Sequence, residues 1–423
     1  MGMFKKIILT FSTKFITALL NFLIVIITAR YLGAEGRGTI SLIVLGISIN
    51  LIVNDIIGGS ALVYLTPRIN LFKLFVPSYI WALTSSSILT YCLCYFKLIP
   101  VEYYLDVFLL SVLQSLGSIN FAILLGQERI KQHNAINILQ ILLLFISLLV
   151  ILFVFNYQTV SAYIYSLYIG LGFSFAVSLT LIFKHIKPTL FSDWKEVIKS
   201  ILENSIYIQL ANILQIFNYR ISYYILNWFT GAKILGVYST AVSVAEAVWL
   251  VSKSIAMVQY ARISNSTDKN YSRQLTIQLS KFSLLATIIT LLPLLLLPDS
   301  IFILIFGIEF SAIHQVLIYL SIGIISIGFS TIYTHYFSGI GKYHINSIAS
   351  GIGFIFTILF CIILIPKYQL SGAAISASLS YSATSIYLLI AFIKETKLKP
   401  SELIPSSKDF SFLMRELKKL LNT

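Results

Sequence analysis

The segment Gly33-Ala34-Glu35-Gly36-Arg37-Gly38-Thr39-Ile40-Ser41 returns 198 residues later as Gly231-Ala232-Lys233-Ile234-Leu235-Gly236-Val237-Tyr238-Ser239. Both copies read Gly-Ala-x-x-x-Gly-x-x-Ser, and each lies between two long apolar stretches. Single glycines often only terminate helices and allow tight turns, but that does not explain a shared pattern of nine residues. A chain of 423 residues that repeats itself at about half its length is predicted to contain two similar halves.

Composition places these halves in a membrane. Hydrophobic residues make up 58% of the chain and charged residues only 11%, whereas a soluble domain carries about 25% charged residues. The apolar residues form continuous runs long enough to cross a hydrocarbon core about 30 Å thick. Because the runs do not alternate with polar residues, they predict helices and exclude a transmembrane β-barrel. We therefore expect an all-α polytopic membrane protein.

Polar breaks divide the apolar runs into twelve predicted transmembrane helices. Their approximate limits are 8–31, 39–63, 75–97, 105–126, 135–155, 161–183, 205–228, 235–258, 276–297, 311–337, 345–365 and 371–393. Residues 301–306 form an apolar run too short to span, and we expect this segment at the membrane interface.

Lysines and arginines orient the spans, because cytoplasmic loops of membrane proteins are enriched in both. With the N-terminus inside, 21 of the 30 basic residues fall in cytoplasmic segments, five lie on the opposite side and four lie within spans. This distribution explains the net charge of +14 as a topology signal, without nucleic-acid binding. Both termini are predicted to be cytoplasmic.

The longest internal loop separates two groups of six spans. We expect an N-terminal six-helix lobe over 1–184, a cytoplasmic amphipathic linker over 185–204, a C-terminal six-helix lobe over 205–394 and a cytoplasmic tail over 395–423. Apolar residues at helical spacing after Trp194 predict a linker helix on the inner membrane surface. The tail has a similar face from Lys408 to Leu421, with a solvated, partly ordered tail as the alternative.

Corresponding spans of the two groups run in the same direction, because each group has six. The halves are therefore predicted to be related by a parallel pseudo-two-fold axis along the membrane normal. In a membrane protein this organisation is typical of a transporter whose site lies between the halves.

Arg220 is the most informative charge within a span. It lies 15 residues beyond the start of the predicted span 205–228, where an arginine costs roughly 2.5–3.5 kcal/mol on insertion scales. With Asn218 and Tyr219 beside it, Arg220 predicts a cationic patch in a central cavity. A guanidinium binds phosphate through two hydrogen bonds and keeps its charge. A structural salt bridge within the bundle is the alternative.

The next span carries Glu246 and Lys253, which are seven residues apart and share one helical face. Asp55 corresponds to Lys253 at the same offset of 198 residues. We predict that Lys253 lines the cavity of Arg220 and that Asp55 and Glu246 act in coupling or gating. An ion pair between Asp55 and Lys253 would form a cytoplasmic gate.

Four other basic residues lie in or next to spans. Arg30 and Arg37 flank the first glycine of the repeat and are predicted to lie at the periplasmic mouth. Lys14 and Lys281 lie close to cytoplasmic span ends, and we expect their amines to snorkel to the interface.

No pattern for catalysis or metal binding stands out. The sequence has no Gly-x-x-x-x-Gly-Lys-Ser/Thr phosphate loop and no His-Glu-x-x-His motif. Its three cysteines, Cys92, Cys94 and Cys361, fall inside apolar runs without metal-ligand spacing. We expect no enzyme activity, no metal and no cofactor.

Several motifs together resemble a known family. They are Ala29-Arg30-Tyr31-Leu32-Gly33 followed by Gly38, Gly236-Val237-Tyr238-Ser239-Thr240-Ala241 followed by Glu246, and Ile365-Pro366-Lys367-Tyr368 followed by Gly372-Ala373-Ala374. The set resembles the polysaccharide-export flippases of the multidrug/oligosaccharidyl-lipid/polysaccharide exporter superfamily, and within it the bacterial O-antigen flippases (Wzx). The resemblance covers nearly the whole chain in the number and order of spans.

The resemblance implies a MATE-like fold with two six-helix lobes around a cationic cavity of alternating access. It implies transport of undecaprenyl-diphosphate-linked oligosaccharide from the inner to the outer leaflet of the bacterial cytoplasmic membrane. Coupling to a proton or sodium gradient and contact with other polysaccharide-assembly proteins follow from the same resemblance.

Two other functions remain open. A multidrug or cation antiporter of the same fold would favour acidic residues in the N-terminal lobe, where only Asp55 is available within a span. A membrane-embedded polysaccharide polymerase or ligase would usually need a large extracytoplasmic loop, and the predicted non-cytoplasmic loops are all short.

Overall fold

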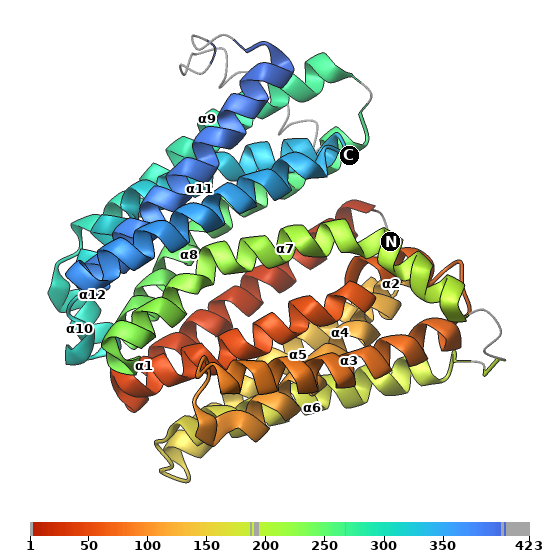
Figure 1. The fold of residues 1–423 in the computed structure, drawn as a ribbon, viewed down its shortest axis with the longest axis horizontal. Helices are drawn as coiled ribbons and strands as arrows, with labels where there is room; N and C mark the ends of the chain where they lie inside the picture. Colours follow the sequence, from red (N-terminus) through yellow and green to blue (C-terminus); the bar gives the residue numbers. More distant parts are fainter. Residues whose placement is uncertain (1–2, 187, 190–193, 267, 399–401, 403–423) are drawn as a thin grey trace. The chain divides into compact units, whose positions relative to one another are not determined.

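The computed structural model describes residues 3–186, 188–189, 194–266, 268–398 and 402, with side chains from residue 13 onward apart from 204, 207 and 208. The described residues are mostly helical and contain no strand (Figure 1). The elements are α1 (Met3–Asn54), η1 (Asp55–Ile57), α2 (Gly59–Leu65), α3 (Leu71–Tyr95), η2 (Val101–Tyr103), α4 (Tyr104–Gly126), α5 (Ile130–Phe153), α6 (Val160–Phe183), α7 (Trp194–Thr230), α8 (Ala232–Ser264), α9 (Lys269–Leu296), α10 (Asp299–Phe306), η3 (Ile308–Phe310), α11 (Ile313–Gly339) and α12 (Tyr343–Thr396).

Helices occupy every predicted span. In the described residues, eight helices are long and apolar enough to cross a membrane, α1 and α12 among them. α12 holds two predicted spans, and α1 holds the first span and the larger part of the second, which continues through η1 and α2. A single residue with non-helical dihedral angles interrupts each helix: Gly33 (φ 69°, ψ −178°) in α1 and Gln369 (φ 45°, ψ −116°) in α12. The third and seventh predicted spans are the helices α3 and α7, which lie outside those eight.

Each copy of the repeated motif begins at a break in the helical path. The φ angle is 69° at Gly33 and 82° at Gly231, a region that L side chains rarely adopt. Helical structure resumes at once with Ala34 and Ala232. The turn expected between the first two spans is therefore a one-residue kink, and the motif itself is helical.

Contacts within the chain define two compact units. The N-terminal unit comprises Met1–Ile216, Thr230–Ser239 and Ile305–Glu309; the C-terminal unit comprises Phe217–Phe229, Thr240–Leu304 and Phe310–Thr423. The second copy of the motif thus belongs to the N-terminal unit, although the rest of α8 does not. The two units are described separately below.

The amphipathic linker and the seventh span form one helix. α7 runs without interruption from Trp194 to Thr230, because this stretch contains neither glycine nor proline to break it. Val197 and Ile201 are buried in a core formed with α2, α3, α4 and α6. The apolar face of the linker thus packs against protein, and its place at the inner membrane surface stays a prediction.

Buried polar side chains join the helices of the N-terminal unit. The Asn54 amide of α1 donates to the Ser86 hydroxyl of α3 at 2.9 Å and also bonds Ser115 of α4. Asn50 donates to Thr90 one turn away, at 3.3 Å. Such interhelical hydrogen bonds, with close packing, hold membrane helices together where lipid removes the hydrophobic driving force.

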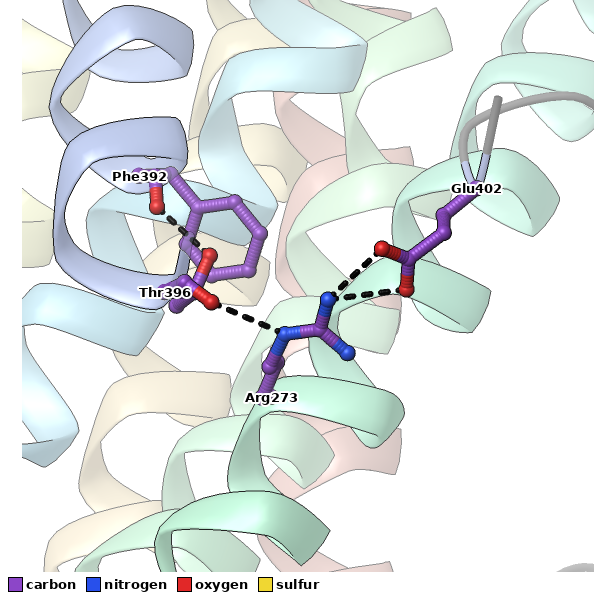
Figure 2. A network of polar contacts seen from close by, with 4 residues as sticks. All are labelled: Arg273, Phe392, Thr396 and Glu402. Atoms are coloured by element: carbon purple, nitrogen blue, oxygen red, sulfur yellow. Dashed lines mark hydrogen bonds and ion pairs between the residues drawn. The ribbon is translucent and has the colours of Figure 1, made fainter. Parts of the chain in front are cut away.

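In the C-terminal unit, an arginine ties the end of α12 to α9. Both carboxylate oxygens of Glu402 lie 2.8 Å from Nη2 of Arg273, and Nε of Arg273 donates to the carbonyl oxygen of Thr396 at 3.1 Å (Figure 2). The Thr396 hydroxyl donates to the Phe392 carbonyl at 2.7 Å. Glu402, a described residue of the predicted tail, is thereby tied to α9. The amphipathic face predicted from Lys408 to Leu421 lies outside the described residues.

Candidate functional site

The two copies of the motif pack against each other within the N-terminal unit. A side-chain carbon built on Gly38 would lie 1.8 Å from the carbonyl oxygen of Ala232, and one built on Gly236 would lie 1.8 Å from the carbonyl oxygen of Ala34. Each glycine thus contacts the alanine of the other copy. Only a residue without a side chain permits backbones to approach this closely.

The serine of each motif completes this contact. The hydroxyl oxygens of Ser41 and Ser239 lie 2.8 Å apart in a hydrogen bond between residues 198 positions apart, which is the repeat offset. Both serines are buried. We call this set of glycine, alanine and serine contacts the repeat contact. It lies on the side that the sequence predicts to be non-cytoplasmic.

Glu309 of η3 connects the two copies a second time. One carboxylate oxygen accepts from the Ala34 backbone N–H at 2.7 Å, and the other lies 2.8 Å from Nζ of Lys233. The first contact caps the helix that resumes after Gly33, where a negative charge is stabilised by the exposed N–H groups. The Lys233 and Glu309 side chains are 63% and 38% exposed, so the ion pair contributes little by itself.

Arg220 is paired in the C-terminal unit. Its Nη2 lies 2.6 Å from Oε1 of Glu246, and its Nη1 donates to the Tyr223 hydroxyl at 2.6 Å. The Arg220 and Glu246 side chains are 27% and 31% exposed. The geometry found is that of the salt-bridge alternative. A role of Arg220 in substrate binding and of Glu246 in coupling stays a prediction.

Asn218 lies at a helix–helix contact. The residue is 3% exposed. Its side-chain amide oxygen, Oδ1, accepts from the Thr357 hydroxyl at 2.8 Å and from the Ser380 hydroxyl at 2.7 Å. These two hydroxyls come from the two halves of α12. Asn218 therefore holds α7 to α12 inside the C-terminal unit, instead of presenting its amide at a cavity surface.

Tyr219 belongs to an aromatic cluster near Lys253. Its ring centroid lies 6.0 Å from that of Trp249 and 5.4 Å from that of Tyr381. Nζ of Lys253 lies 5.8 Å from the Trp249 ring centroid, a distance at which a cation is attracted to an aromatic face. The Lys253 side chain is exposed, so it remains available to an anion.

Asp55 lies in η1 of the N-terminal unit, where its Oδ1 accepts from the Ser118 hydroxyl at 3.3 Å. Lys253 belongs to the C-terminal unit, so the Asp55–Lys253 gate stays a prediction. Arg30 is exposed, whereas Arg37 is only 9% exposed, and a place for either at the periplasmic mouth stays a prediction. The helical motif after Gly33 turns Arg37 into the N-terminal unit.

Lys14 and Lys281 differ from one another. Lys281 is 7% exposed and buried in the C-terminal unit, so the expectation that it snorkels to the interface is wrong. Lys14 is exposed and lies in the wall of a cavity.

This cavity lies entirely within the N-terminal unit and has a volume of about 400 Å³, in the range of small-molecule sites. We call it the N-terminal cavity. Its polar wall includes Lys14, Thr17 and Asn21 of α1, Gln114 of α4, and Asn137 and Gln140 of α5. His133 joins this wall and lies 3.2 Å from the Asn137 amide through its Nε2 atom. No carboxylate is among its described lining residues.

The sequence-based predictions missed Glu309 and the N-terminal cavity. Glu309 is a single acidic residue in a short segment without helical periodicity, so no sequence signal pointed to it. The cavity did have a signal: polar residues three or four positions apart at Lys14, Thr17 and Asn21, inside an otherwise apolar span.

Comparisons of sequence find distant relatives, and no family model matches the chain. The chain is 25% identical over 228 residues to a protein of Haloferax volcanii named a probable low-salt glycan biosynthesis flippase; the match covers 53% of this chain and 48% of that protein. The chain spans about half the length of the curated relatives it matches.

Comparisons of structure extend over nearly the whole chain. The lipid II flippase MurJ, in an inward closed conformation, matches with a TM-score of 0.76 and 17% identity over 97% of this chain and 96% of that chain. An inward-facing multidrug resistance MATE family transporter of the MOP superfamily matches with a TM-score of 0.71 and 13% identity over 90% and 94%. The predicted MATE-like fold is confirmed. The expectation that the chain is not an enzyme agrees with these flippase and transporter relatives.

The repeat contact predicts an efficient cross-link. When Cys92, Cys94 and Cys361 are replaced by alanine, Ser41→Cys with Ser239→Cys should form a disulfide on mild oxidation. The two hydroxyl oxygens are 2.8 Å apart, and a disulfide requires close approach of the two backbones. Mass spectrometry of the linked peptides measures the yield.

The control pair is Ser48→Cys with Ser239→Cys, because Ser48 lies two helical turns, about 10 Å, from Ser41. It should cross-link poorly. Adding Gly38→Ala to the first pair should also reduce the yield, since the new methyl group meets the Ala232 carbonyl. Equal yields from all three proteins would contradict the repeat contact.

Glu309→Ala should weaken the repeat contact more than Lys233→Ala does. The glutamate variant loses the helix cap, worth about 1 kcal/mol, or about fivefold in the open-to-closed ratio. The lysine variant loses only an exposed ion pair, worth about 0–1 kcal/mol. The rate of cross-linking of the Ser41→Cys and Ser239→Cys pair reports the closed population. A larger effect from Lys233→Ala would assign the role to the ion pair instead of the cap.

Proposed function

We propose that this protein is a flippase that moves a lipid-linked oligosaccharide across the membrane, with undecaprenyl-diphosphate-linked repeat units such as those of O-antigen as the substrate. The observation that carries the proposal is that independent comparisons of sequence and of structure both return a flippase. The sequence relative is named for glycan biosynthesis, and the structural relative for lipid II.

The chemistry of the N-terminal cavity supports this class of substrate. A diphosphate joined to sugars cannot cross hydrocarbon by itself, because its charges and hydroxyls would lose their hydration. The cavity offers amide groups, a histidine and Lys14, which suit a neutral or anionic polar group. A carrier of cationic drugs would instead benefit from carboxylates, which are absent from the described lining.

Transport by alternating access requires the repeat contact to open and close. The contact consists of the Ser41–Ser239 hydrogen bond and closely packed backbone, and in this proposal it opens and closes during the cycle. Arg220 and Lys253 are candidates to meet the diphosphate, and Asp55 and Glu246 to couple the cycle to a proton or sodium gradient. The protein would then act in the bacterial cytoplasmic membrane with both termini cytoplasmic, beside other polysaccharide-assembly proteins.

Deleting the gene should trap lipid-linked oligosaccharide in the inner leaflet. The lipid would be protected from a membrane-impermeant oxidant of sugars added to intact spheroplasts, and surface polysaccharide would fall. The cysteine-free protein should restore both readouts. The Ser41→Cys and Ser239→Cys protein should restore them only after reduction, because the disulfide holds the repeat contact closed.

Normal surface polysaccharide in the deletion strain would contradict the proposal. Greater sensitivity to cationic drugs, with the glycan readouts unchanged, would identify an antiporter of the same fold. Transport by the oxidised double-cysteine protein would show that the repeat contact is not part of the cycle.

The Arg220–Glu246 pair separates a structural role from a transport role. Arg220→Leu alone leaves Glu246 uncompensated; breaking a fully buried pair costs roughly 3–5 kcal/mol, and partial exposure of these side chains lowers that cost. The level of folded protein should therefore fall. Arg220→Leu with Glu246→Gln should recover it, because no unpaired charge remains, while transport should stay lost.

Folded protein is measured by fluorescence-detected size-exclusion chromatography, and transport by the accessibility of the lipid-linked oligosaccharide. Recovery of both quantities in the double variant would assign the pair a structural role only. A single variant with normal protein level and no transport would support direct substrate contact.

A further inference from the structure

We propose that the N-terminal cavity binds the sugar portion of the lipid-linked substrate, separately from whatever contacts the diphosphate. This inference rests on the proposed function and names the part of the substrate that this unit recognises. The cavity is contained in one unit, so its binding groups are fixed by the packing of α1, α4, α5 and α6 alone.

The polar wall is built by two helix faces. Lys14, Thr17 and Asn21 are separated by three and four residues, so they lie on one side of α1. His133, Asn137 and Gln140 have the same spacing on α5. Polar side chains within membrane spans are costly unless they face protein or a hydrated cavity. Two such faces meeting at one cavity indicate a site that holds a polar molecule.

The wall contains hydrogen-bonding groups that the protein itself does not use. Among the described residues, the side chains of Asn21, Gln114 and Gln140 have no hydrogen-bond partner. Each amide offers both donors and acceptors, as each hydroxyl of a sugar does. These amides come from three helices, α1, α4 and α5.

The charges of the wall disfavour cationic ligands. The described lining has no carboxylate to attract an organic cation or a metal ion. Among the described lining residues, Lys14 is the only lysine or arginine, and its side chain is exposed. Apolar residues such as Ile141, Leu144 and Leu171 complete the lining, and they suit the C–H faces of a sugar ring. A neutral molecule rich in hydroxyl groups matches this combination best.

Binding of two lipids to the purified protein in nanodiscs tests the inference. The probes are the lipid-linked oligosaccharide purified from the host and polyprenyl diphosphate without sugar. Asn137→Leu with Gln140→Met removes two amides from α5 with little change in volume. Asn21→Leu with Gln114→Met does the same on α1 and α4. Apolar replacements are compatible with membrane spans, and size-exclusion profiles and melting temperatures confirm folding.

Each double variant should bind the glycosylated lipid at least about tenfold more weakly, since two hydrogen bonds are lost. Binding of the sugar-free lipid should stay within about twofold. The matched control is Gln158→Met, which removes an exposed amide between α5 and α6 and should change neither affinity.

Three outcomes would overturn the sugar site, and the third would also overturn the proposed function. If the wild-type protein prefers the glycosylated lipid and both variants retain that affinity, the sugar site is elsewhere while the proposed function stands. If the variants weaken binding of both lipids equally, the cavity does not recognise sugar. If the wild-type protein binds neither lipid, the proposed function fails, and the sugar site fails with it.

Discussion

The close approach of backbone at Gly38 and Gly236 is the constraint on which the region around the repeated motif depends. A side-chain carbon at either position would lie 1.8 Å from a carbonyl oxygen. The Ser41–Ser239 hydrogen bond exists because the backbones already lie this close. In lipid, where apolar residues gain little from leaving the solvent, tight packing of small residues and interhelical hydrogen bonds supply the association energy. The contact is therefore specific to these small residues.

Two ion pairs described here each lie inside one unit. Arg220 and Glu246 both belong to the C-terminal unit, and Lys233 and Glu309 both belong to the N-terminal unit. The Arg220–Glu246 pair involves the C-terminal unit alone, so movement of that unit as a body does not break it. The N-terminal cavity differs, since its wall is mainly neutral amides. Selectivity there would come from the number and placement of hydrogen bonds, and net charge would act mainly on the approach of the substrate.

The fold was largely predictable from the sequence, because run length and polar breaks locate membrane helices directly. Contacts between helices were not. The sequence shows how far Lys281 lies from a span end, but it does not show that the face of α9 that carries Lys281 is turned toward the protein interior. Glu309 acts through tertiary contacts that leave no local pattern. Polar residues such as Asn21 and Gln140 were visible within their spans, yet only the packed structure brings the two helix faces to one cavity.

The reciprocity of the repeat contact bears on the history of the chain. Gly38 meets Ala232 as Gly236 meets Ala34, and Ser41 meets its own counterpart, Ser239. In a symmetric homodimer, an isologous interface has this property: each patch contacts the same patch of the other copy. The contact has the geometry expected of such an interface if two copies of a half-length chain were joined into one polypeptide. Glu309 makes the contact unequal, because it caps the helix at Ala34 and pairs with a lysine that only the second copy carries.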